Sequence, residues 1–181
     1  MVETKIVSNI SFNNKYIKNV KELYLFYRLR YHATLNGGSI AGFKFSNNEY
    51  YRVLPNLVTL GWVNLENQRV KKYRDICKEI DAKNAEFYMT PEMLQSLEAF
   101  KGALLATCES YIIHSKDKIA SKKDKEERSY LVKCKNNPLL KTKELEYNGL
   151  DCIAGRAFNV ELSRLTGLSI PTITRWRRFS K

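Results

Sequence analysis

The sequence predicts a mainly α-helical protein with one small β hairpin. Apolar residues recur every three or four positions in several stretches, which is the spacing of one helix face. One stretch, residues 60–74, instead alternates apolar and polar residues around a short polar turn. Start and stop signals such as Thr90-Pro91 and the Asn-Gly-Gly at 36–38 bound the helical stretches.

The first predicted helix spans residues 19–35. Its apolar positions have helical spacing and are Val20, Leu23, Tyr24, Tyr27 and Tyr31. The glycines after Asn36 end it, because glycine tolerates the left-handed conformation of a helix cap. A second helix is expected from Ser46, a capping residue, to about Thr59. Pro55 lies inside this second helix, so we expect a kink or a break there.

A β hairpin is expected next. Val63 and Leu65 alternate with polar residues, residues 66–68 make the turn, and Val70 and Tyr73 lie on the returning strand. The tip and the returning strand are basic, with Arg69, Lys71, Lys72 and Arg74.

A long amphipathic helix is predicted from Thr90-Pro91, a capping hydroxyl followed by proline at the first helical position. Its apolar stripe consists of Met93, Leu97, Phe100, Leu104, Cys108 and Tyr111. The stripe is a candidate for self-association, or it packs on the N-terminal domain. Residues 115–135 are a solvated extension of the helix or a linker, and Pro138 follows them. We assign residues 90–147 to this amphipathic helix and basic linker.

Two short helices are predicted near the C-terminus. The first spans about 159–167 and ends at Gly167, which supplies a sharp turn. Ser169 is a suitable N-cap for the second, with Pro171 just inside it. Ile173 and Trp176 should face the first helix, and the opposite face is left to threonines and arginines.

Residues 159–178 resemble the helix-turn-helix DNA-binding family. The residues that carry the resemblance are Leu162, Ser163, Gly167, Leu168, Ile173 and Trp176. The resemblance implies that residues 160–167 form the supporting helix and that residues 170–179 enter the major groove. It also implies a DNA-binding module over residues 148–181. The base-facing residues would be Ser169, Thr172, Thr174, Arg175 and Arg178.

The residue types on this face suit DNA on physical grounds as well. An arginine such as Arg175 can donate two hydrogen bonds to guanine in the major groove. Arg177 and Lys181 are placed for phosphates, which position a helix without reading sequence. The alternative is an ordinary helical hairpin with a solvated basic face.

Residues 19–75 resemble a winged-helix domain, which we assign to residues 1–89. The resemblance rests on helix, link, helix and a basic hairpin after Leu60, Gly61 and Trp62. The chain departs from the family between Gly38 and Ser46, which is too short for a full middle helix. The resemblance implies a second groove-facing set, Asn47, Asn48, Tyr51 and Arg52, and phosphate contacts by Arg69, Lys71 and Lys72. Alternatively, this domain contacts proteins, or its basic residues only solvate the hairpin.

The charge distribution indicates a polyanionic partner, either nucleic acid or an anionic membrane surface. The 181 residues carry a formal net charge of +12. Residues 115–143 hold ten basic against four acidic residues, and residues 155–181 hold six against one. Lys122 and Lys123 are therefore expected to add phosphate contacts. No signal peptide or membrane-length apolar run is found, so we expect a cytoplasmic protein without membrane contact.

Enzymatic chemistry has little support in the sequence, and we expect no catalytic residues, metal or cofactor. The four cysteines are widely spaced, without a Cys-x-x-Cys pair, and are expected to be reduced thiols: Cys77, Cys108, Cys134 and Cys152. His32 and His114 are isolated, and no glycine-rich phosphate loop or carboxylate cluster is present.

Two functional hypotheses follow. The first is a sequence-specific double-stranded DNA-binding protein, a transcriptional regulator or a replication or partition factor of a phage or mobile element. It would act as a homodimer or a higher homo-oligomer, because one half-site alone binds weakly. The second is a structural or assembly protein, such as a DNA-packaging adaptor or virion component, using the module for protein contacts or nonspecific DNA binding.

Overall fold

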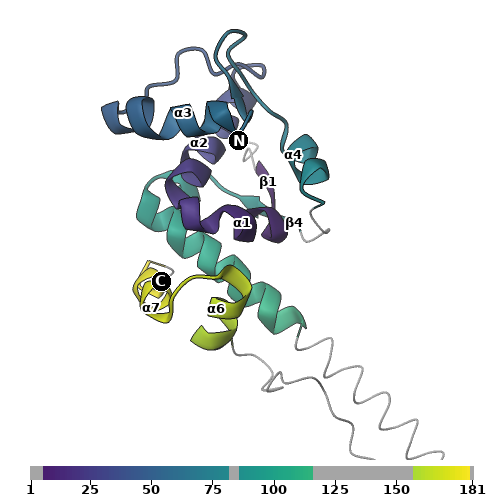
Figure 1. Ribbon diagram of the computed structural model, residues 1–181, viewed down its shortest axis with the longest axis vertical. Coiled ribbons are helices and arrows are strands. Elements are labelled where there is room, and N and C mark those ends of the chain that lie inside the picture. The colour runs from purple at the N-terminus through teal and green to yellow at the C-terminus, as the bar shows by residue number, and fades with distance from the viewer. Residues whose placement is uncertain (1–5, 82–85, 116–156, 180–181) are drawn as a thin grey trace, which may run out of the picture.

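Helix α2 (Val20–Leu35) lies at the centre of the N-terminal part of the fold, where elements from before and after it in the chain pack against it (Figure 1). The computed structural model describes residues 6–81, 86–115 and 157–179. The remaining elements are, in order, β1 (Ile6–Asn9), α1 (Ile10–Tyr16), the 3-10 turn η1 (Ile17–Asn19), the π-helical segment η2 (Glu49–Val53), α3 (Leu54–Thr59), β2 (Val63–Asn64), β3 (Arg69–Val70), α4 (Tyr73–Glu79), β4 (Glu86–Met89), the 3-10 turn η3 (Glu92–Leu94), a helix of residues 97–115, α6 (Asn159–Thr166) and α7 (Ile170–Arg177). We call the helix of residues 97–115 the central helix. The predicted class, mainly α, is confirmed.

The predicted first helix is confirmed as α2, and the Asn-Gly-Gly sequence ends it as expected. The Gly38 N–H donates to the Ala33 carbonyl at 2.7 Å, and Gly37 has a φ of +62°. This left-handed backbone is easy for glycine and strained for other residues. The chain therefore leaves α2 sharply and turns toward the hairpin.

Aromatic rings fill the core between α1, α2 and the hairpin. Trp62, at the entrance to the hairpin, is 3% exposed. Its ring centroid lies 5.3 Å from Phe12, 4.6 Å from Tyr16 and 4.9 Å from Phe26. Tilted and edge-on arrangements of this kind add to the burial free energy. The core of the N-terminal part is thus set by rings from three separate elements.

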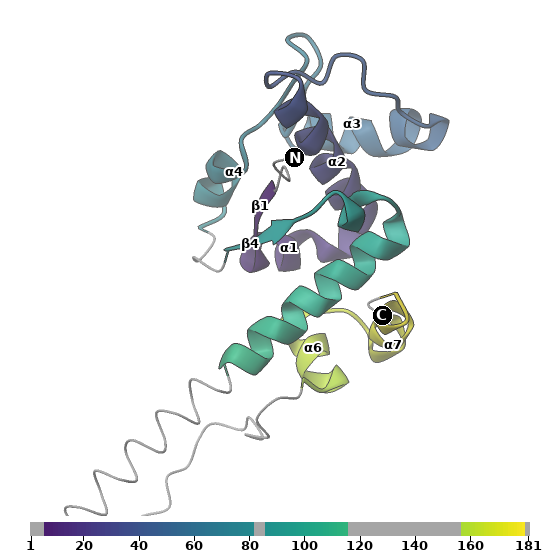
Figure 2. The same cartoon turned by 180° about the vertical axis from the view of Figure 1, so that it is seen from behind.

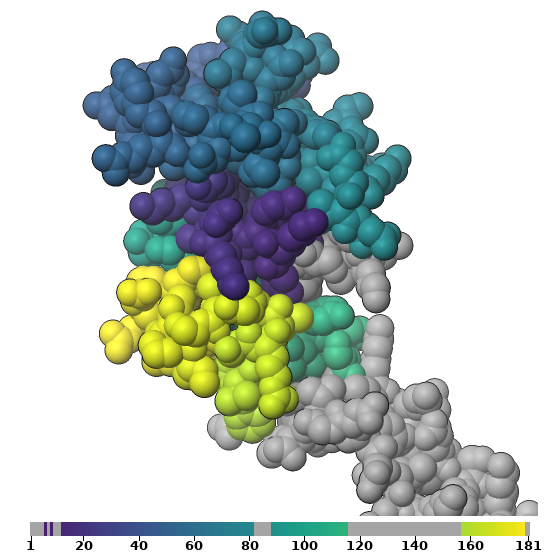
Figure 3. Space-filling model, viewed as in Figure 1, coloured from purple at the N-terminus to yellow at the C-terminus, as the bar shows by residue number. Residues whose placement is uncertain are grey.

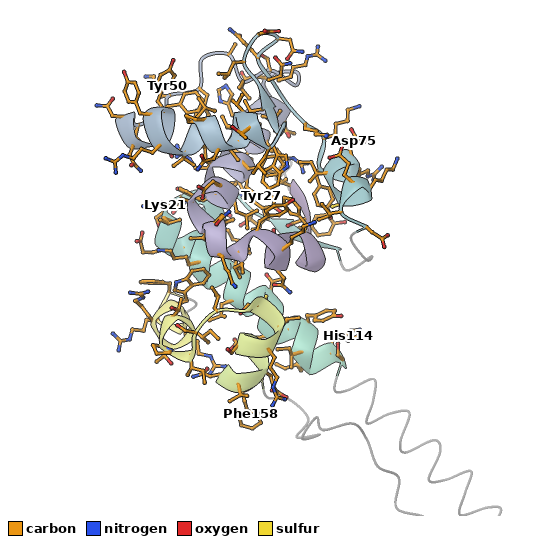
Figure 4. The ribbon with its side chains drawn as sticks, viewed as in Figure 1. Lys21, Tyr27, Tyr50, Asp75, His114 and Phe158 are labelled. Atoms are coloured by element: carbon orange, nitrogen blue, oxygen red, sulfur yellow. The ribbon has the colours of Figure 1, made fainter. Side chains whose placement is uncertain are left out.

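A closed hydrogen-bonded triad links β1, α1 and α2. The Tyr27 hydroxyl donates to Asn13 Oδ1 at 2.9 Å, Asn13 Nδ2 donates to Ser8 Oγ at 2.9 Å, and Ser8 and Tyr27 also bond to each other. All three residues are buried, and burial raises the pKa of Tyr27 above its ordinary value. Figure 4 shows Tyr27 in the interior of the fold. Because every member has a partner, the cost of burying these polar groups is offset.

Strands β1 and β4 form a sheet that the sequence analysis did not predict. They pair antiparallel, with Ile6 opposite Met89 and Asn9 opposite Glu86. Both members are only four residues long and lie far apart in the sequence, so neither carries a local hairpin signal. This sheet brings the chain back across α1 before the central helix begins.

The second predicted helix is present and starts at the predicted cap. The Ser46 N–H donates to Glu49 Oε2 at 2.8 Å, and the Glu49 N–H donates to Ser46 Oγ at 3.2 Å, which is a capping box. The helix widens at η2, where the Leu54 N–H donates to the Glu49 carbonyl, five residues back. The expected irregularity at Pro55 is thus a π-helical segment directly before the proline, which has no N–H to donate.

The predicted hairpin is confirmed as β2–β3, with two details corrected. Val63 is buried, but Leu65 lies in the turn and is 48% exposed. Tyr73 was expected on the returning strand, but it begins α4 and packs into the core. The strands are shorter than predicted because the chain turns into a helix as soon as it reaches the core.

The winged-helix arrangement stays a prediction. Residues 36–46 contain no helix, as the short spacing suggested. Ser39 instead forms an isolated antiparallel bridge to Arg69, and the Ile40 N–H donates to the Gln68 carbonyl at 2.9 Å. The segment between α2 and η2 therefore pairs briefly with the hairpin, at Ser39 and Ile40.

The central helix begins later than predicted, and its buried stripe is rotated. Thr90-Pro91 starts the short turn η3, and the helix itself begins after Ser96, whose hydroxyl accepts the Ala99 N–H at 3.0 Å. Tyr111 is 40% exposed, whereas Leu105 and Ile112 are buried. The Phe100 ring lies 5.4 Å from Tyr24 and 5.8 Å from Tyr27. Of the two alternatives for the stripe, packing on the N-terminal domain is observed at Phe100.

Within the described residues, no helix has the length and apolarity required to cross a lipid bilayer.

Candidate nucleic-acid interface

The C-terminal module is a helix pair with a left-handed turn. Helix α6 begins after Phe158, whose N–H donates to Glu161 Oε2 at 2.8 Å. Gly167 ends α6 with a φ of +67°, and Ser169 precedes α7 in an extended conformation. The predicted bounds, 159–167 and 170–179, agree with the observed helices to within two residues. The glycine turn therefore sets the angle between α6 and α7.

The inner faces of the two helices form a small apolar core. Its buried members are Leu162, Thr166, Leu168, Ile173 and Trp176. The Thr166 hydroxyl donates to the Leu162 carbonyl at 2.6 Å and accepts the Leu168 N–H at 3.2 Å. The Ser163 hydroxyl donates to the Leu168 carbonyl at 2.7 Å. These hydroxyls satisfy backbone groups at the turn, which explains why small polar residues suit these positions.

The module packs against the rest of the protein through this core. It lies beside the central helix and α1, as two opposite views show (Figures 1 and 2). Lys101 of the central helix lies over the Trp176 ring, 5.9 Å from its centroid. A methyl group added to Gly167 would lie 3.3 Å from Lys18 Cε. In the space-filling view the module forms part of the outer surface (Figure 3).

The outer face of α7 remains open to solvent. Ser169, Thr174, Arg175 and Arg178 are exposed, and Thr172 is half-buried. The Ser169 and Thr172 hydroxyls bond to each other at 2.9 Å. The Thr174 hydroxyl donates to the Ile170 carbonyl at 3.0 Å and accepts from Asn159 Nδ2 at 3.3 Å. Arg175 and Arg178 therefore supply the long hydrogen-bond-donating side chains of this face. The hydroxyl groups already form hydrogen bonds within the module.

Arg177 has a different environment from its neighbours. Its guanidinium forms an ion pair with Glu109 of the central helix, and Nη2 also donates to the Ala157 carbonyl at 2.7 Å. These contacts hold the side chain between α7 and the central helix. We therefore leave Arg177 out of the proposed DNA-facing set. The sequence carried no signal for this pair, because Glu109 and Arg177 are far apart in the chain.

The second predicted surface lies at the opposite end of the molecule. Asn47, Asn48, Tyr51 and Arg52 are all exposed, and Tyr51 is 74% exposed. On the hairpin side Arg69 and Lys72 are exposed, whereas Lys71 is half-buried and pairs with Glu79 of α4. The four residues between 47 and 52 lie near one another, and so do the three basic residues between 69 and 72. The structure separates both sets from α7, with the body of the protein between them (Figure 1).

Three predicted phosphate contacts, Lys122, Lys123 and Lys181, lie outside the described residues, as do Cys134 and Cys152. One exposed cation of the module, Arg164 in the last turn of α6, was not among the predicted site residues. Its position before Gly167 was visible in the sequence, but it lies on the supporting helix α6 rather than on α7.

The two cysteines in the described residues are free thiols. Cys108 is buried and donates to Asn14 Oδ1 at 3.4 Å. Burial, with a smaller contribution from Glu109, raises the pKa of Cys108 to about 12. The thiol therefore stays protonated at neutral pH and is a poor nucleophile.

Gly167→Ala should lower the free energy of unfolding by about 1–2 kcal/mol, because a Cβ disfavours the left-handed backbone. Lys18 has a flexible side chain and can move aside, so the backbone conformation accounts for most of the loss. Urea unfolding followed by circular dichroism measures the change. Gly167→Asn is the matched control, since asparagine tolerates this conformation better. Equal losses for both variants would contradict the argument.

Comparisons of the chain with protein-family models, curated proteins and solved structures produced no match.

Proposed function

We propose that this protein binds double-stranded DNA sequence-specifically, with α7 entering the major groove. The observation that carries the proposal is the division of α7 into two faces. Ile173 and Trp176 are buried against the rest of the protein, while Arg175 and Arg178 project into solvent. A helix anchored on one side and basic on the other suits the major groove, which admits a single helix.

Charge supports the same proposal. Residues 155–181 carry six basic residues and one acidic residue, Glu161, whose carboxylate is occupied at the start of α6. No carboxylate in the described residues forms an ion pair with Arg175 or Arg178. Phosphates would offset this charge on binding, with release of counterions. A transcriptional regulator or a replication or partition factor of a phage or mobile element would use such a module, as a homodimer on paired half-sites.

Selection from random duplexes tests the proposal. Under sequence-specific binding, the full chain should enrich one motif over successive rounds. Enrichment of no motif, with duplexes retained in proportion to their length, would contradict it.

Arg175→Ala should then lose discrimination at particular base pairs, by about 5- to 150-fold, because a bidentate contact to guanine contributes about 1–3 kcal/mol. Competition mobility shifts with single-base variants of the selected site measure the loss. Arg164→Ala is the matched control: it removes an exposed arginine from α6 and should weaken all duplexes alike. An even loss for Arg175→Ala would show that this residue contacts only phosphates.

The assembly alternative is favoured by one observation. Three apolar side chains of the module are exposed: Phe158 at 39%, Val160 at 49% and Ile170 at 44%. Figure 4 shows Phe158 at the outer end of α6. Phe158 and Val160 stand at the start of α6 and Ile170 at the start of α7, and exposed apolar groups can supply a protein contact. Light scattering that gives a large ring rather than a dimer would support this alternative.

The N-terminal part supplies a second, separate proposal for DNA contact. Its exposed set Asn47, Asn48, Tyr51 and Arg52, with Arg69 and Lys72 on the hairpin, is polar and basic in the way a winged-helix-like surface requires. Since this surface lies at the other end of the molecule from α7, the two would touch separate DNA segments.

A further inference from the structure

A basic cavity lies between α2, the hairpin and α4, away from α7. Its volume is about 460 Å³. Five cationic side chains line it: Arg30, Arg69, Lys71, Lys72 and Arg74. Ala33, Val70 and Tyr73 add apolar surface to the wall. Three separate elements thus converge on one cavity, of which the sequence indicated only the basic hairpin.

The charge of this cavity is poorly compensated by the protein. No acidic residue is among the side chains that line it. Within the described residues, only Lys71 of the five cations forms an ion pair, with Glu79. Cations held this close repel one another, so a bound anion would lower the electrostatic free energy of the folded state.

Arg30 is partly buried, whereas the other two arginines of the cavity are exposed. Its guanidinium is stacked between two rings, 5.1 Å from the Tyr73 centroid and 5.7 Å from that of Phe26. Nη1 is out of contact with solvent and has no hydrogen-bond partner. Burial lowers the pKa of Arg30, yet a guanidinium stays charged at neutral pH. A buried charge without an acceptor is costly, so an anion bound in the adjoining cavity would lower the electrostatic free energy of this guanidinium.

We infer that this cavity binds the phosphate groups of a small phosphorylated molecule of nucleotide size. Arginine and lysine are the residues that hold phosphate, and five of them surround the hollow. A volume of about 460 Å³ exceeds that of a lone phosphate and lies in the range of small-molecule sites. The apolar wall of Ala33, Val70 and Tyr73 would contact the part of the ligand that carries no phosphate.

Binding of ADP to the full chain is the test. Thermal unfolding and calorimetric titration are performed at constant ionic strength, with sodium chloride in place of ADP as the reference. Saturating ADP is expected to raise Tm by about 5 °C, since a ligand that binds only the folded state stabilises it. ADP should bind at least about tenfold more tightly than inorganic phosphate, because it adds a second phosphate and apolar contacts.

Variants show whether the cavity is responsible. Arg69→Ala and Arg74→Ala should each weaken ADP binding by about tenfold, the usual effect of one hydrogen bond to a charged group. Lys78→Ala is the matched control, because Lys78 is an exposed cation on α4, the helix of Arg74, and does not line the cavity. All three residues lie at or near the surface, so these variants should fold.

Four results would overturn the inference. The first is a Tm in ADP equal to that in sodium chloride, and the second is an equal loss of ADP binding in Lys78→Ala and Arg74→Ala. The third is inorganic phosphate binding as tightly as ADP, which would indicate a site for the ion alone. The fourth is a short duplex that displaces ADP and that Arg74→Ala also binds more weakly, which would assign the cavity to the DNA backbone. None of these results depends on α7, so the proposal for the C-terminal module is tested separately.

Discussion

Trp176→Ala should abolish specific duplex binding while the N-terminal part of the protein stays folded. Trp176 is 4% exposed, and a buried tryptophan replaced by alanine costs about 3–5 kcal/mol. The module consists of two helices of eight residues each, which are too short to be stable alone. When its main anchor is lost, the fraction of molecules with α7 in place falls, and apparent affinity falls in proportion.

Mobility shifts with the selected duplex measure the loss of binding. The protein has two tryptophans, so the fluorescence of the variant comes from Trp62 alone and reports the N-terminal core. Trp62 emission should remain that of a buried ring. Trp176→Phe is the control, because it keeps an aromatic ring against the central helix and should retain most binding. Trp176→Ala that binds the duplex as tightly as the unaltered protein would contradict the proposed role of α7.

Phe100→Ala should lower the free energy of unfolding by about 3–5 kcal/mol. Phe100 is fully buried, and its ring contacts Tyr24 and Tyr27 of α2. The cavity left behind lies between the central helix and α2, where the rings around it cannot close the space. Urea unfolding followed by circular dichroism measures the change.

Glu98→Ala is the matched control on the same helix. Glu98 is exposed, so its replacement should change stability by less than about 0.5 kcal/mol. The mass in solution should be the same for both variants, because Phe100 is buried within one chain. A Phe100→Ala variant with full stability and a smaller assembly would instead place this residue at an interface between copies.

The C-terminal helix pair could be predicted in detail because all of its signals are local. A glycine between two apolar repeats, a serine cap and a proline in the first turn each act within a few residues of one another. The alternation of Val63 and Val70 around a polar turn is also local, and so is the Ser46–Glu49 cap. These elements appear where the sequence placed them.

The β1–β4 sheet and the register of the central helix could not be predicted in the same way. Ile6 pairs with Met89 only because the chain between them folds into α1, α2 and the hairpin, which brings its two ends together. The stripe of the central helix depends on which neighbouring elements cover it, so Ile112 is buried and Tyr111 is exposed. Spacing along a helix defines a face only approximately, and the partner surface selects the residues that pack.

The amino-acid sequence alone therefore specified the helical class, the hairpin and the basic helix pair, since these follow from backbone preferences over short distances. Only the tertiary fold placed Arg177 in an ion pair with Glu109 instead of on the outer face of α7. It also gathered Arg30, Arg69 and Arg74 around one cavity. Both outcomes have the same physical reason: charges far apart in the chain become neighbours only when the apolar core brings their elements together.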